Sequence, residues 1–325
     1  MSDSAIRLAV ITGGLGFIGQ ALANYLQAIN VPVVVIDKRS VATQVPGLRV
    51  VHGAVEDEQV WKTFDSVPQG TVVFHCAGLI SVAESVEDPR KYFETNVCAS
   101  LAMLNHILQF IGPVPVVFSS SAAVYGIPQQ VPIPETSPLA PLSPYGETKR
   151  QFEEILAAYQ QAYGLPWVAL RYFNAAGTMG SVVERHDPES HLLPRVRNAV
   201  VAGQEPVVYG TDYPTLDGTA VRDYVHIHDL ADAHVRAAQY LLQGGTSQAL
   251  NLGSGQGTSV GQVITAFEEV IGHEIRVRYA ERRPGDPPEL VADISQARLT
   301  LGWVPRFSSI QRIVSEVWGS LAERT

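Results

Sequence analysis

The chain has 325 residues, of which 46% are hydrophobic and 17% charged, and its formal net charge at pH 7 is −9. This balance is typical of a globular protein and argues against a disordered chain. The negative charge argues against non-specific binding to nucleic acid and against docking on anionic membranes. A chain of this length buries about 75% of its unfolded surface, so its core needs no disulfide or metal.

The first half of the chain alternates β-branched runs with helical patterns, which predicts a doubly wound α/β fold around a parallel sheet. Residues 33–36 are apolar on both faces, as expected where helices cover both sides of the sheet. Ligands then bind at the carboxyl ends of the strands. We predict strands at 7–12, 32–37, 49–53, 71–76, 115–121 and 167–174, and helices at 17–29, 89–110 and 145–163.

The second half is richer in Gly and Pro and less regular. Its patterns predict helices at 229–242, 260–271 and 308–321, and one strand at 249–252 that returns to the first sheet. We therefore expect a first domain at 1–176, with a return segment at about 225–253, and a smaller α/β lobe at 177–325. The ligand is expected between the two.

The two cysteines, Cys76 and Cys98, lie in a predicted strand and a predicted helix, so we expect them to be small core side chains in a reducing compartment. No run of 18 apolar residues predicts a membrane span. The N-terminus lacks a cleavable signal pattern. These features predict a cytoplasmic protein.

A glycine-rich turn, Thr12-Gly13-Gly14-Leu15-Gly16-Phe17-Ile18-Gly19, joins the first predicted strand to the first predicted helix. Glycines at 13, 16 and 19 permit a tight turn, close approach to a pyrophosphate and close helix–strand packing. The helix N-terminus supplies N–H donors to the phosphates. The turn therefore predicts a Rossmann-like dinucleotide site in the first domain.

Asp37 ends the second predicted strand, 18 residues after Gly19. A carboxylate there accepts hydrogen bonds from the ribose 2′-hydroxyl and repels a 2′-phosphate, which favours NAD over NADP. Lys38 and Arg39 follow directly, and their positive charges are expected to weaken the preference for NAD over NADP.

Tyr145 and Lys149 are four residues apart at the start of a predicted helix, so they project from the same face. We expect the lysine ammonium to lower the pKa of the phenol from its ordinary value of about 10. The resulting phenolate would take a proton from a sugar or alcohol hydroxyl near neutral pH.

Together with the glycine turn and Tyr145/Lys149, the run Ser119-Ser120-Ser121-Ala122-Ala123-Val124-Tyr125-Gly126 resembles the extended short-chain dehydrogenase/reductase superfamily. Residues 209–232, YGTDYPTLDGTAVRDYVHIHDLAD, narrow the resemblance to the UDP-glucose 4-epimerase family. Residues 75–78 (HCAG), 171–174 (RYFN) and 282–286 (RRPGD) are also similar to that family, and the likeness runs from about residue 8 to about residue 305.

The resemblance implies three catalytic residues. Tyr145 is the base, Ser121 hydrogen-bonds the 4-oxygen of the sugar, and Lys149 holds the nicotinamide ribose and tunes Tyr145. It implies an NAD site formed by Gly13, Gly16, Phe17, Ile18, Gly19, Asp37, Val55, Ala77, Gly78, Asn96, Tyr145, Lys149 and Tyr172.

The resemblance also implies a UDP-sugar site. Its residues are Ser121, Tyr145, Asn174, His191, Leu192, Tyr209, Arg222, Arg283, Asp286 and Leu290. Asn174, Arg222 and Arg283 are expected on the UDP moiety, and guanidinium groups suit a diphosphate because they donate in a fork and stay charged.

The chain departs from the family pattern at four positions. Ala54 replaces an Asp that contacts the adenine, and Ile80 replaces a Lys near the cofactor, so both changes imply looser NAD binding. His191 stands where some members carry Asn. Leu290 stands where a bulky Tyr excludes N-acetylated sugars and a small Cys or Ser admits them, which leaves the substrate breadth open.

The implied activity is inversion at C4 of a UDP-hexose, UDP-glucose or UDP-galactose, through a transient 4-keto sugar, in a homodimer paired through helices that include residues 89–110. A 4-epimerase of UDP-N-acetylglucosamine, UDP-glucuronate or a UDP-pentose is the alternative, and a non-catalytic nucleotide-binding protein is a remote one. Ala122 and Ala123 stand where dehydratases and decarboxylases carry an acid, which argues against those reactions.

A metal enzyme would need a cluster of ligands. His226, His228 and Asp229 are close in sequence, and His186, Asp187 and His191 add candidates. We expect the two histidines at 226 and 228 to be structural and Asp229 to cap a helix, so no metal is predicted.

Overall fold

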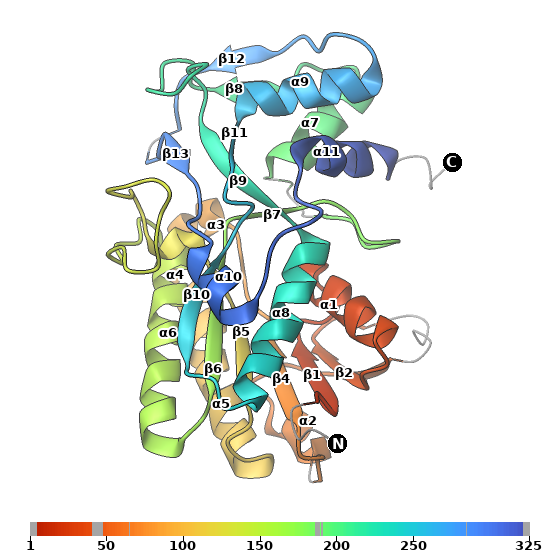
Figure 1. Ribbon diagram of the computed structural model, residues 1–325, viewed down its shortest axis with the longest axis vertical. Helices are drawn as coiled ribbons and strands as arrows, with labels where there is room; N and C mark the ends of the chain where they lie inside the picture. The colour runs from red at the N-terminus through yellow and green to blue at the C-terminus, as the bar shows by residue number, and fades with distance from the viewer. Residues whose placement is uncertain are drawn as a thin grey trace.

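A seven-stranded parallel sheet forms the centre of the larger lobe in the computed structural model, which describes residues 5–40, 48–64, 66–185, 189, 191–283 and 285–320 (Figure 1). The strand order is β10-β6-β5-β4-β1-β2-β3, and all six pairings are parallel. The predicted fold class is confirmed, including the late strand that returns to the first sheet. The strands are β1 (Leu8–Thr12), β2 (Val33–Asp37), β3 (Arg49–His52), β4 (Thr71–His75), β5 (Val116–Ser121), β6 (Trp167–Tyr172) and β10 (Gln248–Leu252).

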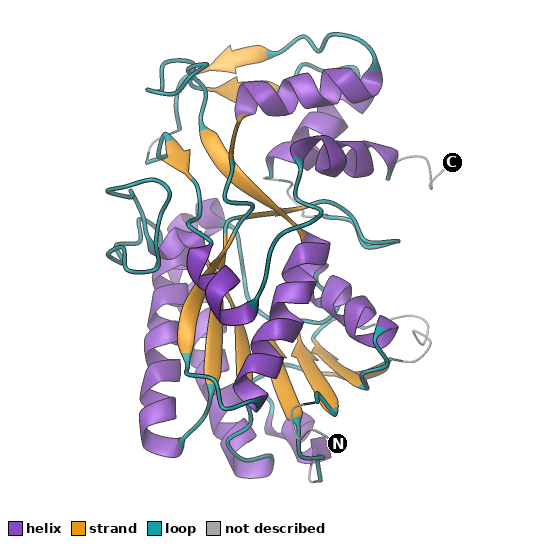
Figure 2. Ribbon diagram, in the orientation of Figure 1, coloured by secondary structure: helices purple, strands orange, loops and turns teal. Residues whose placement is uncertain are grey.

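Helices cover both faces of this sheet (Figure 2). Ala9 and Ile11 of β1 pack in one apolar cluster with helices α1 (Phe17–Ala28) and α8 (Ile227–Leu242). Val10 packs in a second cluster with α5 (Ala99–Phe110) and α6 (Pro144–Tyr163). Because successive residues of a strand point to opposite faces, both faces of each central strand are largely apolar, and the buried polar residues that they carry, such as Ser120 and Arg171, have hydrogen-bond partners.

The chain crosses to a second sheet at Phe173, so the predicted strand at 167–174 is too long. The pairing of β6 with β10 ends at Tyr172 and Leu252, after which Asn174 begins β7 (Asn174–Ala176) and pairs with Tyr224 of β9 (Val221–His226). Strand β9 also pairs with β11 (Gly257–Ser259) and β13 (Glu289–Leu290). This second sheet links the two lobes (Figure 1).

The smaller lobe contains more regular structure than the sequence predicted. Two parallel strands, β8 (Val207–Tyr209) and β12 (Arg278–Ala280), lie beside helices α7 (Leu192–Val201), α9 (Val260–Ile271) and α11 (Ile310–Gly319) (Figure 1). The predicted helix at 260–271 is confirmed, and α11 is shorter than predicted, with residue 321 outside the described ranges. Short strands of two to six residues carry too little periodicity to be recognised in sequence.

The predicted helix at 89–110 is interrupted. After α3 (Val82–Glu87), the chain forms α4 (Pro89–Phe93), a π-helical turn at Glu94–Cys98 and then α5. Cys98 is exposed, so the prediction that it is a core side chain is wrong. Cys76, just beyond β4, is half-buried and packs against the core cluster, in agreement with the prediction. The buried positions in this run, among them Tyr92, Asn96, Ala99 and Met103, follow the inner helical face, which does not include residue 98.

Four short helices complete the described part of the chain. They are α2 (Glu58–Trp61), the 3₁₀ turns Lys62–Phe64 and Ala122–Val124, and α10 (Ser295–Leu301). None of the described helices combines the length and apolar character needed to cross a bilayer.

The residues around the start of α8 have structural partners. His226 is the N-cap and accepts a hydrogen bond from His228 N, so the prediction that Asp229 caps the helix is wrong. Asp229 instead accepts from Arg306 N, Phe307 N and Ser308 Oγ, at 2.9, 2.8 and 2.6 Å, which fastens the later chain to the helix. Within the described ranges no group of three or more His, Cys, Asp or Glu could hold a metal ion; His186 and Asp187 lie outside those ranges.

Candidate active site

Ser121, Tyr145 and Lys149 meet where the end of β5 lies against the start of α6. Ser143 caps α6 by accepting a hydrogen bond from Gly146 N at 3.2 Å, and Pro144 begins the helix, so Tyr145 lies in its first turn. The Ser121 hydroxyl lies close enough to Tyr145 to lower the pKa of the phenol. Lys149 Nζ lies 5.8 Å from the centre of the Tyr145 ring and donates to the Ser119 carbonyl oxygen at 2.8 Å. The structure thus brings the three predicted residues together.

The pKa of Tyr145 is shifted in the direction opposite to the sequence prediction. Burial raises the pKa of the phenol above 10, and the hydrogen bond with Ser121 only partly opposes this. Burial also lowers the pKa of Lys149 to about 8, against the opposing charges of Cys76 and Glu153. The lysine ammonium is directed at the Ser119 carbonyl rather than at the phenol oxygen. This explains why the four-residue spacing alone predicted the wrong direction for the pKa of Tyr145.

In the glycine turn at the end of β1, backbone segments approach one another more closely than any side chain would allow. Gly13 has φ +64°, and a Cβ there would lie 2.7 Å from the Ala77 backbone. A Cβ on Gly19 would lie 2.4 Å from Gly13 O, so only glycine lets α1 pack this closely on the turn. Gly16 is the N-cap of α1, and Phe17 and Ile18 form its first turn, where unpaired N–H groups point outward from the helix end.

Asp37 is buried at the end of β2 and already holds four hydrogen bonds. Its oxygens accept from Leu15 N, Arg39 N and the Arg39 guanidinium, at 2.9 to 3.1 Å. Burial opposes ionisation, but these donors, led by Arg39, lower the pKa of the carboxyl. A ribose that binds Asp37 must therefore displace the exposed Arg39 side chain.

Asn96 holds the loop that follows β4. Its amide donates to Leu79 O at 3.0 Å and to Thr148 Oγ1 at 3.1 Å, and its carbonyl accepts from Leu79 N at 2.8 Å. The π-helical turn directs Asn96 to this loop. Gly78, at φ +155°, lies where a Cβ would be 3.7 Å from Lys149 Nζ, so the loop borders the Ser–Tyr–Lys site.

Two other predicted cofactor residues are buried. Val55 lies beyond β3 in the core cluster that includes β1 and β2, next to the departure at Ala54. Tyr172 donates to Ser119 Oγ at 2.9 Å and is hydrogen-bonded to His234 of α8, so its hydroxyl is directed into the protein. Ile80, the other departure, is an exposed apolar side chain.

The predicted nucleotide residues gather in the smaller lobe. Arg283 lies over the Tyr209 ring at 4.2 Å, and Arg222 is paired with Asp286 and donates to Val221 O at 2.7 Å. Arg195 of α7 lies over the same ring at 5.8 Å and, through its hydrogen bond, lowers the pKa of Tyr209. Sequence reasoning missed Arg195, although its place four residues after His191 was a signal.

The remaining predicted substrate residues lie at element ends. His191 caps α7, lies 2.5 Å from Glu184 and precedes Leu192. Asn174 begins β7. Leu290 pairs with Arg222 in the second sheet and packs in a cluster with Ala122 and Tyr125, just beyond Ser121. Leu290 therefore lies in a strand beside Arg222 and packs next to Ser121.

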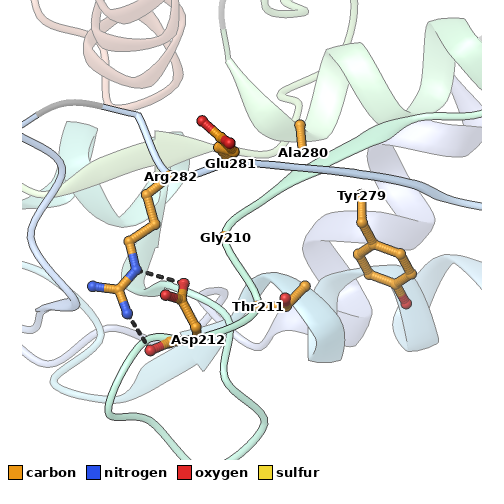
Figure 3. A pocket seen from close by; sticks show the side chains of 7 residues that line it. All are labelled: Gly210, Thr211, Asp212, Tyr279, Ala280, Glu281 and Arg282. Carbon is orange, nitrogen blue, oxygen red and sulfur yellow. Dashed lines mark hydrogen bonds and ion pairs between the residues drawn. The ribbon is translucent and has the colours of Figure 1, made fainter.

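A cavity of about 730 Å³ opens at the carboxyl ends of β8 and β12 (Figure 3). Its lining is Gly210, Thr211, Asp212, Tyr279, Ala280, Glu281 and Arg282. Arg282 Nε donates to Asp212 Oδ1 at 2.6 Å across it. The lining adjoins Tyr209 and Arg283 in the chain without including either, so the cavity neighbours the nucleotide residues.

The parallel sheet, the glycine turn and the Ser–Tyr–Lys set define a dinucleotide-binding α/β protein with a short-chain dehydrogenase/reductase type of site. The model of the NAD dependent epimerase/dehydratase family matches residues 9–253, and the chain belongs to that family. This confirms the resemblance drawn from the motifs.

Named relatives agree over nearly the whole chain. A UDP-glucose 4-epimerase of Halalkalibacterium halodurans is 40% identical over 314 residues, which cover 95% of this chain and 94% of that protein. The crystal structure of UDP-glucose 4-epimerase from Brucella ovis in complex with NAD has a TM-score of 0.91 at 39% identity and covers 96% of this chain and 97% of its own. The enzyme from Stenotrophomonas maltophila, with bound NAD and formylated UDP-arabinopyranose, has a TM-score of 0.89 at 34% identity and covers 98% of both chains.

The pKa directions predict opposite titrations for two tyrosines of the ligand-free protein. Tyr145 should titrate above 10 because burial disfavours its phenolate, and Tyr209 should titrate below 10 because its neighbouring arginines favour it. Carbon-13 NMR of labelled tyrosines, assigned with Tyr145→Phe and Tyr209→Phe, measures both. A Tyr145 signal that titrates below 10 would contradict the structure.

Proposed function

We propose that the protein is a UDP-glucose/UDP-galactose 4-epimerase. The observation that carries this proposal is the meeting of Ser121, Tyr145 and Lys149 beside the dinucleotide turn, in a chain of the epimerase/dehydratase family. Ala122, directly after Ser121, has no acidic group that could take part in an elimination, which supports epimerisation over dehydration.

NAD is the cofactor, and the residues present fit it: the glycines leave room that a Cβ would fill, and Asp37 supplies ribose acceptors. When bound, NAD would supply a reversible hydride acceptor for sugar C4, so the reaction would have no net oxidation. Asn96 and Gly78 shape the loop beside Lys149, and Arg39 must leave Asp37 as the ribose enters.

Tyr145, as the phenolate, takes the proton of the sugar 4-hydroxyl and later gives a proton back to the same oxygen. Because burial raises the pKa of this phenol in the ligand-free protein, the phenolate requires a nearby positive charge, which Lys149 and bound NAD⁺ would supply. Ser121 lies beside Tyr145 and lowers the pKa of its phenol, so the two hydroxyls would share the 4-oxygen, one accepting while the other donates. Lys149, held by the Ser119 carbonyl, keeps a cation beside the developing negative charge. The sugar is tethered through its UDP by Arg222, Arg283 and Tyr209 of the smaller lobe.

Tyr145→Phe should lower turnover of UDP-galactose at least about 100-fold, because general acid–base catalysis contributes this much. The amount of bound NAD and the affinity for UDP should not change, since the substitution removes only one hydroxyl. Product analysis by chromatography, with UDP-galactose, UDP-N-acetylgalactosamine and UDP-glucuronate supplied separately, gives the rates. Tyr163→Phe, an exposed tyrosine of the same helix, is the matched control.

An active Tyr145→Phe protein would refute the assigned base. If the wild-type protein turned over none of the three sugars, the epimerase proposal would fail, and a non-catalytic nucleotide-binding protein would be favoured instead.

Leu290 favours a second candidate, a 4-epimerase that also accepts N-acetylated sugars. Its backbone pairs with Arg222, and its side chain packs in the cluster of Ala122 and Tyr125, next to Ser121, so its volume would limit the space beside the sugar. Leu290→Ser should raise kcat/KM for UDP-N-acetylgalactosamine relative to UDP-galactose by about tenfold or more, and Leu290→Tyr should lower it. Leu299→Ser, at an exposed leucine of α10, controls for the substitution itself. Unchanged ratios in both Leu290 variants would exclude this role.

We also propose that residues 1–176, with the return segment at about 225–253, hold NAD, and that residues 177–325 mainly hold the UDP-sugar. The membership of β10 and α8 in the first lobe supports this division.

Free Cys76 and Cys98 support a cytoplasmic location, and recovery of the protein from a secreted fraction would oppose it.

A homodimer is proposed through α5 and α6. Cys98, Leu101, Asn105 and Leu108 recur at helical spacing on one face of the run, and Cys98, Leu101 and Asn105 are exposed there. Tyr159 of α6 donates to Asn105 Oδ1 at 2.5 Å, which joins the two helices into one surface. Leu101→Asp should therefore give the monomer mass in light scattering. A monomer mass for the wild type would exclude the dimer.

A further inference from the structure

Helix α6 contacts the end of β5 at three successive helical turns. Tyr145 lies beside Ser121, Lys149 Nζ donates to Ser119 O at 2.8 Å, and Ser120 Oγ donates to Glu153 Oε1 at 2.5 Å. The three α6 residues are four apart, so they form one inward stripe. The first two contacts involve the proposed catalytic residues, and the third joins two other buried side chains.

Glu153 is itself held by a buried ion pair. Arg171 of β6 donates to both of its carboxylate oxygens, the shortest contact being 2.6 Å, and both side chains are 6% exposed. Arg171 also donates to the Tyr125 hydroxyl at 2.8 Å, and Tyr125 donates to Asn251 Oδ1 at 2.7 Å. The network therefore joins α6, β5, β6 and β10 behind the catalytic serine.

We propose that Glu153 is a positioning residue for epimerisation, which acts through Ser120 to hold the end of β5 against α6 so that Ser121, Tyr145 and Lys149 keep their mutual geometry. This inference rests on the proposed function. A buried carboxylate is suited to the task because a hydrogen bond to a charged acceptor is stronger than a neutral one and its direction is fixed by the arginine fork. Glu153 touches neither sugar nor cofactor in this role.

The charge of Glu153 also acts on Lys149. The groups that face the Lys149 ammonium are Cys76 and His75 of the β4 end and Tyr145 and Glu153 of its own helix. Glu153 raises the pKa of Lys149 against the effect of burial. Loss of this charge therefore makes Lys149 lose its proton at lower pH.

The test compares Glu153→Gln with Glu154→Gln. Glu154 is the next residue of the same helix, 60% exposed and paired with Arg150, so it controls for the identical substitution. In Glu153→Gln we expect kcat for UDP-galactose to fall at least about tenfold, since small misplacement of catalytic groups costs up to about 100-fold. KM and bound NAD should change little, and the alkaline limb of the pH–kcat profile should move to lower pH.

Ser120→Ala provides a second variant, because Glu153→Gln leaves Arg171 without its partner and can fail to fold. Ser120→Ala removes only the contact between Glu153 and β5 and leaves the ion pair intact. It should lower kcat with KM unchanged and keep the wild-type pH profile, since no charge is lost.

A lower melting temperature with unchanged kcat in Ser120→Ala, or in a folded Glu153→Gln, would mean a merely structural role and overturn the inference. Such a result leaves the proposed function intact. Failure of the wild type to epimerise in the same assay overturns the proposed function instead.

Discussion

The hydrogen bond from Lys149 Nζ to the Ser119 carbonyl is the interaction on which the site depends. It joins a buried ammonium to the backbone of a central strand at 2.8 Å. A buried cation is costly unless it is hydrogen-bonded, so the lysine is held at this one position. It joins α6 to the end of β5 one helical turn after Tyr145, next to Ser121. The raised pKa of Tyr145 follows from the same burial that makes the arrangement rigid.

Much of this arrangement was predictable from sequence because it depends on local patterns. Gly13 and Gly19 stand where a Cβ would collide with backbone, and such constraints leave a visible glycine spacing. The apolar runs of β2 and β4 predicted a buried parallel sheet, because helices on both faces exclude polar side chains. The pair Tyr145/Lys149 was visible because four residues make one helical turn.

Other features depend on contacts between distant segments and left no local pattern. The turn from the first to the second sheet at Phe173 is decided by where β10 stops pairing, nearly 80 residues later. The direction of the Tyr145 pKa depends on how deeply the phenol is buried, which spacing does not report. The pairing of Arg222 with Asp286 required β13 to return beside β9.

The charges of the two lobes explain how a chain with net charge −9 can hold a diphosphate. Arg222 is paired with Asp286, and the exposed Arg283 lies over the Tyr209 ring, so both guanidinium groups have a partner. At the proposed UDP site a diphosphate would compete with one carboxylate for Arg222 and would meet Arg283 beside an aromatic face, where a planar cation is already oriented. At the proposed cofactor site the pairing of Arg39 with Asp37 is an equivalent arrangement. If the proposed sites are right, each has an arginine or carboxylate that already holds a partner, and ligand binding would exchange one partner for another without first ordering a free side chain.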